Sequence, residues 1–238
     1  MKPERPEPPA SPQEGEAVRP GRGAFTTRPE VRAVYQRRAR HYDFAAKLYY
    51  LIGFREQAYR KMAIEALQLR RGDRVVDIGC GTGLNFAILQ DKVGPKGRII
   101  GVDLSPAMLA EARRRVTGHG WSNVELVESA AAAYLFPREI DGILSTLALT
   151  LEPDYDAVIA RGAEALRPGD RWVVLDIKLP FNWLRHLAPY VIFLVRPFAV
   201  SLALAERHPW VAMERHLENT TLTELYFGFA YIASGEAL

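Results

Sequence analysis

The chain has 238 residues, 48% hydrophobic and 25% charged, which fits one globular domain with short appendages and is short for two. Its net charge of +3 favours an anionic surface or substrate without requiring one. The densest basic run, Arg113-Arg114-Arg115, lies near the end of an expected helix, where cations complement the helix dipole. We therefore expect no nucleic-acid partner.

Cysteine usage and the N-terminus bear on the compartment. Cys80 is the single cysteine, so an intramolecular disulfide is excluded and a reducing compartment is compatible. The N-terminus lacks an apolar signal-peptide core. We expect a cytoplasmic location, with membrane association left open, and the sequence gives no signal of oligomeric state.

The N-terminal part divides in two. Residues 1–30 are rich in Pro, Glu, Arg and Gly and poor in large apolar residues, which predicts a disordered tail. Residues 31–69 are expected to be helical, with Tyr35, Tyr42 and Tyr49 spaced seven apart on one helix face. Gly53 is expected to break this stretch, and the second helix to run to Leu69.

From Arg74 onward, apolar strand patterns alternate with helical ones. Strands are expected at 74–78, 98–103, 124–127, 140–146 and 172–177, and helices at 84–90, 105–118 and 154–166. Ser105-Pro106 is the start signal of the helix at 105–118, and Pro168-Gly169 is expected to stop the helix at 154–166. Such alternation implies an α/β fold with right-handed crossovers and a mostly parallel sheet. Residues 181–218 look helical, and 221–234 are β-rich.

The most informative segment is the strand-to-helix junction Val75–Gly83, with glycines at positions 79, 81 and 83. Glycine lets the backbone approach a ligand closely, and a helix N-terminus offers free N–H groups to an anion. Asp103 closes the next strand, 20 residues beyond Gly83. That is the spacing at which an acid accepts from ribose hydroxyls in nucleotide-binding βαβ units.

The pattern D-x-G-x-G-x-G differs from the dinucleotide fingerprint, whose third glycine would fall at Leu84. It resembles class I S-adenosylmethionine (SAM) dependent methyltransferases, over roughly residues 31–238. The resemblance implies a Rossmann-like, mostly parallel seven-stranded sheet with helices on both faces, N-terminal helices and a helical C-terminal cap over 181–218. It also implies SAM as cofactor and S-adenosylhomocysteine as product. The cofactor contacts then fall on Asp77, Gly79, Cys80, Gly81, Thr82, Gly83 and Asn85, with Asp103 on the ribose.

By the same analogy, Leu104 and Met108 flank the adenine, and Ser145, at the end of a strand, lies beside the methionine moiety. Many relatives have an acid after the third strand that accepts from the adenine amino group. Here Ala130 occupies that place, so Ser129 or the backbone at Ala130 and Ala131 would serve instead.

Candidates for the acceptor side come from both ends of the chain. Tyr35 and Tyr42, with Tyr49, would form an aromatic wall near a sulfonium or ammonium. His186, with His208 and His216 as alternatives, is the candidate base for an acceptor that must lose a proton. Helix packing, for the tyrosines, and ordinary surface or core positions, for the histidines, remain alternatives. No metal site is expected.

The acceptor itself stays open. The stretch from Tyr35 to Arg55 resembles the N-terminal helices of quinone C-methyltransferases and of lipid head-group N-methyltransferases, with the second group closer. Leu187–Leu204 is apolar but interrupted by Pro189, Arg196 and Pro197, which argues against a membrane span. It is either a lid over an acceptor pocket or a peripheral membrane contact.

The leading prediction is N-methylation of an amine on a lipid or other small molecule. Methylation of a quinone or another small-molecule acceptor at carbon or oxygen is the alternative. A NAD(P)-dependent oxidoreductase and a non-catalytic SAM-binding module are the rivals from other classes.

Overall fold

The computed structural model describes residues 53–180 and 207–238. Within them lies a seven-stranded sheet of order β3-β2-β1-β4-β5-β7-β6. The first five strands in that order run parallel, and β7 is antiparallel to both β5 and β6. The strands are β1 (Arg74–Ile78), β2 (Arg98–Asp103), β3 (Val124–Glu128), β4 (Ile140–Thr146), β5 (Leu166–Ile177), β6 (Glu218–Leu225) and β7 (Ala230–Glu236). The expected Rossmann-like fold is confirmed.

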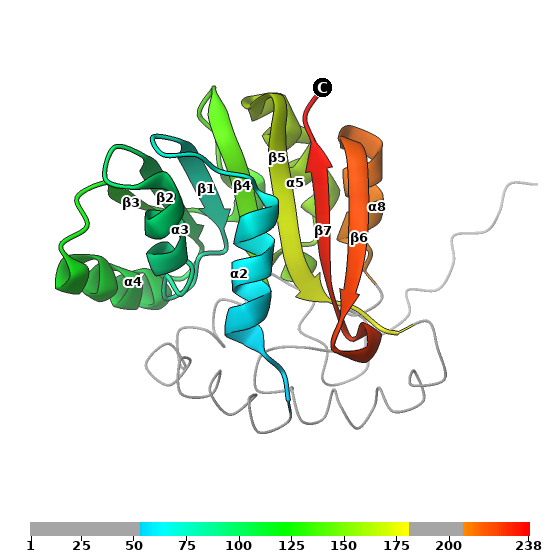
Figure 1. Ribbon diagram of the computed structural model, residues 1–238, viewed down its shortest axis with the longest axis horizontal. Coiled ribbons are helices and arrows are strands. Elements are labelled where there is room, and N and C mark those ends of the chain that lie inside the picture. Colours follow the sequence, from blue (N-terminus) through cyan, green and yellow to red (C-terminus); the bar gives the residue numbers. More distant parts are fainter. Residues whose placement is uncertain (1–52, 181–206) are drawn as a thin grey trace, which may run out of the picture.

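Helices cover both faces of the sheet (Figure 1). One face packs against α2 (Glu56–Ala66), α3 (Phe86–Val93) and α4 (Pro106–His119). The other packs against α5 (Tyr155–Ala165) and α8 (Pro209–His216), with Trp172 and Tyr231 fully buried between the layers. Strands β1 and β4 are buried along nearly their whole length, as expected for central strands covered on both faces.

Several expected boundaries are confirmed, and their local chemistry explains them. The strands at 74–78, 98–103 and 140–146 match β1, β2 and β4. Helix α4 begins after Ser105, whose Oγ accepts from the Met108 N–H, and Pro106 occupies the first turn. It ends at Gly120, which takes the left-handed conformation that terminates many helices. These signals are local, which is why the sequence alone reveals them.

Three expected elements have wrong boundaries. The helix expected at 84–90 is α3, which begins at Phe86 and ends at Val93. Strand β5 begins at Leu166, directly after α5, so Pro168-Gly169 lies inside the strand instead of separating helix from strand. A register shift against β4 between Ile140 and Gly142 absorbs this irregular start. Helix α2 ends at Ala66, not Leu69, because Gln68 adopts a φ of +56°.

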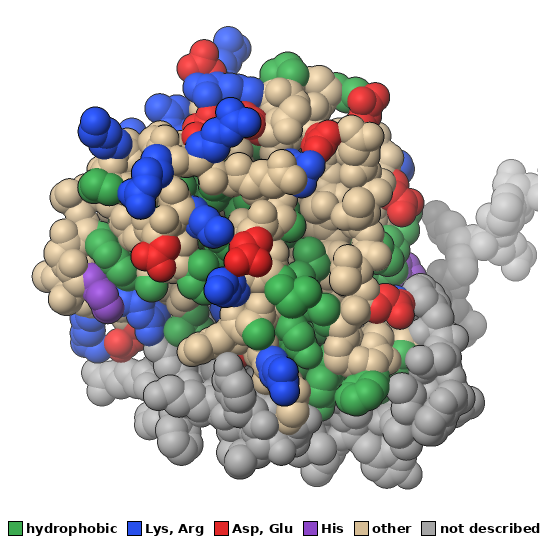
Figure 2. Space-filling model, viewed as in Figure 1, with side chains coloured by type: hydrophobic (Ala, Val, Ile, Leu, Met, Phe, Trp, Pro, Cys, Tyr) green, Lys and Arg blue, Asp and Glu red, His purple; other side chains and the backbone are tan. Residues whose placement is uncertain are grey.

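The C-terminal part agrees with expectation where it is described. Within the expected 181–218 cap, residues 207–218 contain α8, and residues 181–206 lie outside the described residues, as does the 1–30 tail. The β-rich stretch at 221–234 forms β6 and β7. No helix within residues 53–180 and 207–238 is long and apolar enough to cross a membrane. On the face shown in Figure 2, described basic and acidic side chains lie close together over the upper part of the view.

Candidate functional site

An open cavity lies at the carboxyl edge of the parallel strands. Arg60 of α2 and four segments line it: the glycine loop after β1, the end of β2 with the start of α4, the turn after β3, and the segment after β4. We call this last segment, residues 147–152, the β4 wall. The lining residues are Arg60, Ile78, Gly79, Cys80, Gly81, Thr82, Leu84, Val102, Asp103, Leu104, Ser105, Met108, Ser129, Ala130, Ala131, Thr146, Leu147, Ala148, Leu149, Leu151 and Glu152.

The glycine loop has a conformation that side chains would oppose. Gly79, Gly81 and Gly83 have φ values of +69°, +55° and +77°, a region that glycine enters without a Cβ penalty. A Cβ at Gly79 would lie 2.3 Å from the Cβ of Ala148, so the loop packs closely against the β4 wall. A Cβ at Gly81 would meet nothing within 4 Å. Gly81 therefore leaves open space at the cavity for a ligand.

Asp103 ties the loop to β2. Its Oδ2 accepts from the Gly81 N–H at 2.8 Å, and its Oδ1 accepts from the Ser105 N–H at 2.8 Å. Each carboxylate oxygen keeps a further lone pair with which to accept from a ribose hydroxyl. Burial raises the pKa of Asp103, and the two backbone N–H bonds oppose that rise. The acid expected at the ribose thus faces the cavity and also shapes the loop.

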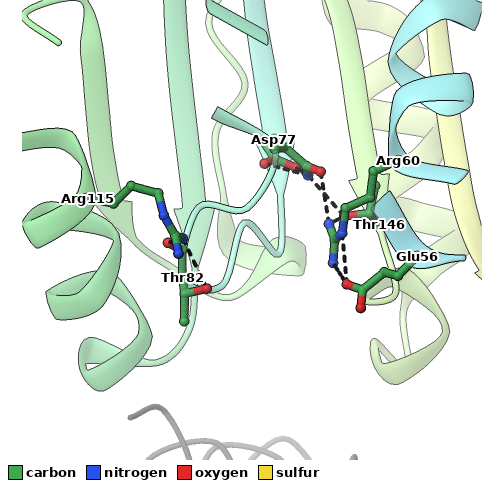
Figure 3. A network of polar contacts seen from close by, with 7 residues as sticks. Glu56, Arg60, Asp77, Thr82, Arg115 and Thr146 are labelled. Carbon is green, nitrogen blue, oxygen red and sulfur yellow. Dashed lines mark hydrogen bonds and ion pairs between the residues drawn. The ribbon is translucent and has the colours of Figure 1, made fainter. Parts of the chain in front are cut away.

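A hydrogen-bonding network that the sequence analysis did not predict lies on the other side of the glycine loop (Figure 3). Arg60, from α2, donates from Nε and Nη2 to Glu56 Oε1 at 2.9 and 2.7 Å. Its Nη1 donates to Asn85 Oδ1 at 2.9 Å and to Thr146 Oγ1 at 2.6 Å. Arg60 is 5% exposed and is the one cation among the described lining residues. It brings a positive charge to the end of the cavity where the glycine loop meets β4.

Asp77 lies beneath this network and is fully buried. Asn85 Nδ2 donates to both of its carboxylate oxygens, at 3.1 and 2.9 Å. Burial raises the pKa of Asp77 to about 7, while the Asn85 hydrogen bonds and the Arg60 charge lower it. Asp77 does not line the cavity. It therefore supports the Asn85 and Arg60 side chains from below.

A second arginine reaches the loop from outside (Figure 3). Arg115 Nη1 donates to the carbonyl oxygen of Thr82 and lies 3.3 Å from Thr82 Oγ1. The sequence suggests only a helix-dipole role for Arg113-Arg114-Arg115. The structure gives Arg115 a specific contact with the tip of the glycine loop, whereas Arg114 pairs with Glu111 on the surface.

Most of the expected cofactor residues meet at this cavity. Those that line it are Gly79, Cys80, Gly81, Thr82, Asp103, Leu104, Met108, Ser129, Ala130 and Ala131. Asp77, Gly83, Asn85 and Ser145 do not line it. Ser145 is fully buried in β4, and the next residue, Thr146, reaches the cavity instead.

The β4 wall is a second feature that the sequence did not reveal. Leu147 has a φ of +56° and donates its N–H to the Leu175 carbonyl at 2.7 Å. A branched residue in this region is strained, and such strain concentrates at functional sites. The wall presents apolar Leu147, Ala148, Leu149 and Leu151 to the cavity, together with Glu152, which is 8% exposed and whose Oε1 accepts from the Asp154 N–H at 3.3 Å.

The expected acceptor-side residues are only partly described. Tyr35, Tyr42, Tyr49 and His186 lie outside the described residues. His208 packs edge-on to Trp210, and His216 Nε2 lies 3.3 Å from Asp156 Oδ1. Neither histidine is among the described residues that line the cavity. Among the described residues, no group of three or more His, Cys, Asp or Glu could hold a metal ion.

Comparison with known proteins agrees with this geometry. A family model described as a methyltransferase domain matches residues 75–169. The demethylmenaquinone methyltransferase of Geobacillus kaustophilus is 28% identical over 186 residues, which cover 76% of this chain and 78% of that protein. The family model, the curated relative and the shared fold together support a class I SAM-dependent methyltransferase domain with SAM as its cofactor.

Two solved structures share the fold at lower identity. Geranyl diphosphate C-methyltransferase from Streptomyces coelicolor, solved with S-adenosylhomocysteine, has a TM-score of 0.60 at 15% identity. The match covers 77% of this chain and 79% of that one. Phosphoethanolamine N-methyltransferase 2 of Haemonchus contortus, solved with SAM, has a TM-score of 0.54 at 22% identity over 69% of this chain and 38% of that one. Nothing in these matches favours the NAD(P)-dependent oxidoreductase alternative.

Proposed function

We propose that the protein methylates an amine carried by a lipid head group. The observation that carries this proposal is the composition of the β4 wall: four apolar residues and one carboxylate, Glu152, at the cavity. Apolar residues favour a hydrocarbon-bearing acceptor. A carboxylate in a site of low dielectric attracts an ammonium and can hold it with charge-assisted hydrogen bonds.

The lining also fits the cofactor. The open space at Gly81 admits the ligand close to the backbone, and Asp103 has lone pairs for the ribose. We infer that Arg60 holds the methionine carboxylate, since it is the cation among the described lining residues. Leu104 and Met108 provide an apolar surface against which the adenine would pack. When bound, SAM supplies an electrophilic methyl group on a positively charged sulfur.

The reaction needs alignment more than a protein nucleophile. Methyl transfer would form a bond between the lone pair of the neutral amine nitrogen and the methyl carbon, and the electron pair of the broken carbon–sulfur bond would stay on sulfur. The amine then carries the positive charge that sulfur has lost. An ammonium acceptor must first release a proton, and the carboxylate of Glu152 on the β4 wall would be the base that receives it. Holding both partners at contact distance is the main contribution of the protein.

A second candidate is C-methylation of a quinol. It is favoured by the similarity to demethylmenaquinone methyltransferase over 76% of this chain. The apolar β4 wall suits an isoprenoid quinol as well as a lipid. The acceptor atom distinguishes the two candidates, because a quinol brings no ammonium to Glu152.

The test uses the full chain with methyl-labelled SAM and two acceptor preparations: phosphatidylethanolamine vesicles, and vesicles containing a reduced demethylated quinone. Label that enters the amine lipid supports the proposal, and label that enters only the quinol replaces it with the second candidate. Label found only in a soluble product rejects both. The Gly81→Val variant, which fills the open space at Gly81, is the background control.

A variant pair tests the role of Glu152. Glu152→Gln should raise KM for the amine lipid roughly tenfold, the effect of losing one hydrogen bond to a charged group. Glu164→Gln, an exposed glutamate on α5, is the matched control and should change nothing. Equal KM values for the two variants would remove Glu152 from the acceptor site.

A further inference from the structure

The backbone of Thr150, in the middle of the β4 wall, forms hydrogen bonds with two side chains. Its N–H donates to Asp176 Oδ2 at 2.9 Å, and its carbonyl accepts from Arg207 Nη1 at 2.9 Å. Thr150 and Asp176 are 1% and 2% exposed. The neighbouring residues Leu149 and Leu151 line the cavity, whereas Thr150 does not. These two hydrogen bonds, which we call the Thr150 clamp, therefore hold the wall at a residue that does not line the cavity.

Asp176 is itself held in place. Its second oxygen accepts from the Ile177 N–H at 2.8 Å, and the residue before it, Leu175, accepts from the Leu147 N–H. The start and the middle of the β4 wall are thus fastened to successive residues of β5. Burial raises the pKa of Asp176 to about 6, against the lowering effect of its backbone hydrogen bonds.

Arg207 reaches the wall from a distant part of the chain. It is the first described residue after 181–206 and precedes α8. Burial lowers the pKa of its guanidinium, and the nearby Tyr155 and Glu152 oppose that effect. Arg207 therefore bonds the Thr150 carbonyl and lies within electrostatic range of the proposed acceptor carboxylate.

We propose that Arg207 and Asp176 are positioning residues, which fix the β4 wall at the distance from the glycine loop that the acceptor requires. The proposal rests on the proposed function, because it assigns the wall to the acceptor. Ala148 of the wall packs closely against Gly79 of the glycine loop, so a shift of the wall would change the spacing between the two segments.

The test compares Arg207→Gln with Arg215→Gln, which removes a surface arginine of α8 paired with Asp156. We expect Arg207→Gln to speed hydrogen–deuterium exchange in a peptide spanning the wall, and to raise the acceptor KM roughly tenfold. S-adenosylhomocysteine affinity and kcat should stay within twofold of wild type, and Arg207→Lys should restore part of the KM. Arg215→Gln should change none of these values.

The outcomes separate this inference from the proposed function. If no amine lipid is methylated, the hydrogen–deuterium exchange rate of the wall and the S-adenosylhomocysteine affinity still test whether Arg207 holds the wall in place. Equal wall exchange in Arg207→Gln and Arg215→Gln would overturn the inference. So would an affinity for S-adenosylhomocysteine that falls as far as the acceptor KM rises, because the effect would then be a general loss of structure. Asp176→Asn combined with Arg207→Gln should loosen the wall by less than the sum of the two single changes.

Discussion

Arg60 offers the sharpest test of the cofactor site. If it holds the methionine carboxylate, its loss removes a hydrogen bond between two charged groups, worth about 1.5–3 kcal/mol. That corresponds to a roughly 10- to 150-fold weaker binding of S-adenosylhomocysteine. Binding of 5′-methylthioadenosine, which lacks the amino acid carboxylate, should change little. Calorimetric titration of both ligands measures the difference.

The Arg60 substitution should be made in a protein that already lacks the Glu56 carboxylate, because Arg60 also neutralises Glu56, which is 4% exposed. Removing one partner of a buried ion pair costs about 3–5 kcal/mol of stability. The comparison is therefore between Glu56→Gln and the double variant Glu56→Gln/Arg60→Gln, neither of which leaves an unpaired carboxylate at position 56. If the double variant loses affinity for both ligands equally, or for neither, the assignment of Arg60 to the carboxylate is wrong.

Three further predictions concern the loop and its supports. Gly81→Ala should fold but bind S-adenosylhomocysteine weakly, whereas Gly79→Ala should lower Tm more, because its Cβ meets Ala148 at 2.3 Å; thermal melts and titrations of both variants check this. The pKa of Asp77 rises from 3.8 to about 7 on folding, so the folded state binds the extra proton, and the free energy of unfolding should fall as pH rises from about 4 to 7, by at most about 1.4 kcal/mol per pH unit. Asp77→Asn should flatten this fall between pH 6 and 7 in denaturant titrations, and an unchanged slope would contradict the assignment. Arg115→Gln should weaken S-adenosylhomocysteine binding, and Arg114→Gln should not, since only Arg115 contacts Thr82; equal affinities would exclude a role for Arg115 in the loop.

The sequence was sufficient for features encoded locally. The glycines at 79, 81 and 83 and the acid 20 residues later predict a nucleotide cavity because strand, loop and acid share one βαβ unit. The Ser105-Pro106 start of α4 is equally local. The same reasoning correctly places β1, β2 and β4.

The features that were missed depend on contacts between distant residues. Arg60 looks like half of an ordinary Glu–Arg pair on a helix, and only the packing of α2 against β4 brings it to Thr146, 86 positions away. The strain at Leu147 has no sequence signal, because leucine rarely takes a positive φ. Ser145 was expected beside the ligand, but Thr146 lines the cavity instead, because neighbouring residues of a strand face opposite ways.

The central claim is that the cavity between the glycine loop and Asp103 binds an adenosine that bears an amino acid. Titrating the full chain with S-adenosylhomocysteine, NAD and NADP in parallel tests it most directly. We predict saturable binding of one S-adenosylhomocysteine per chain, competed by SAM, and no measurable heat with either dinucleotide. Binding of NAD or NADP without binding of S-adenosylhomocysteine would contradict it.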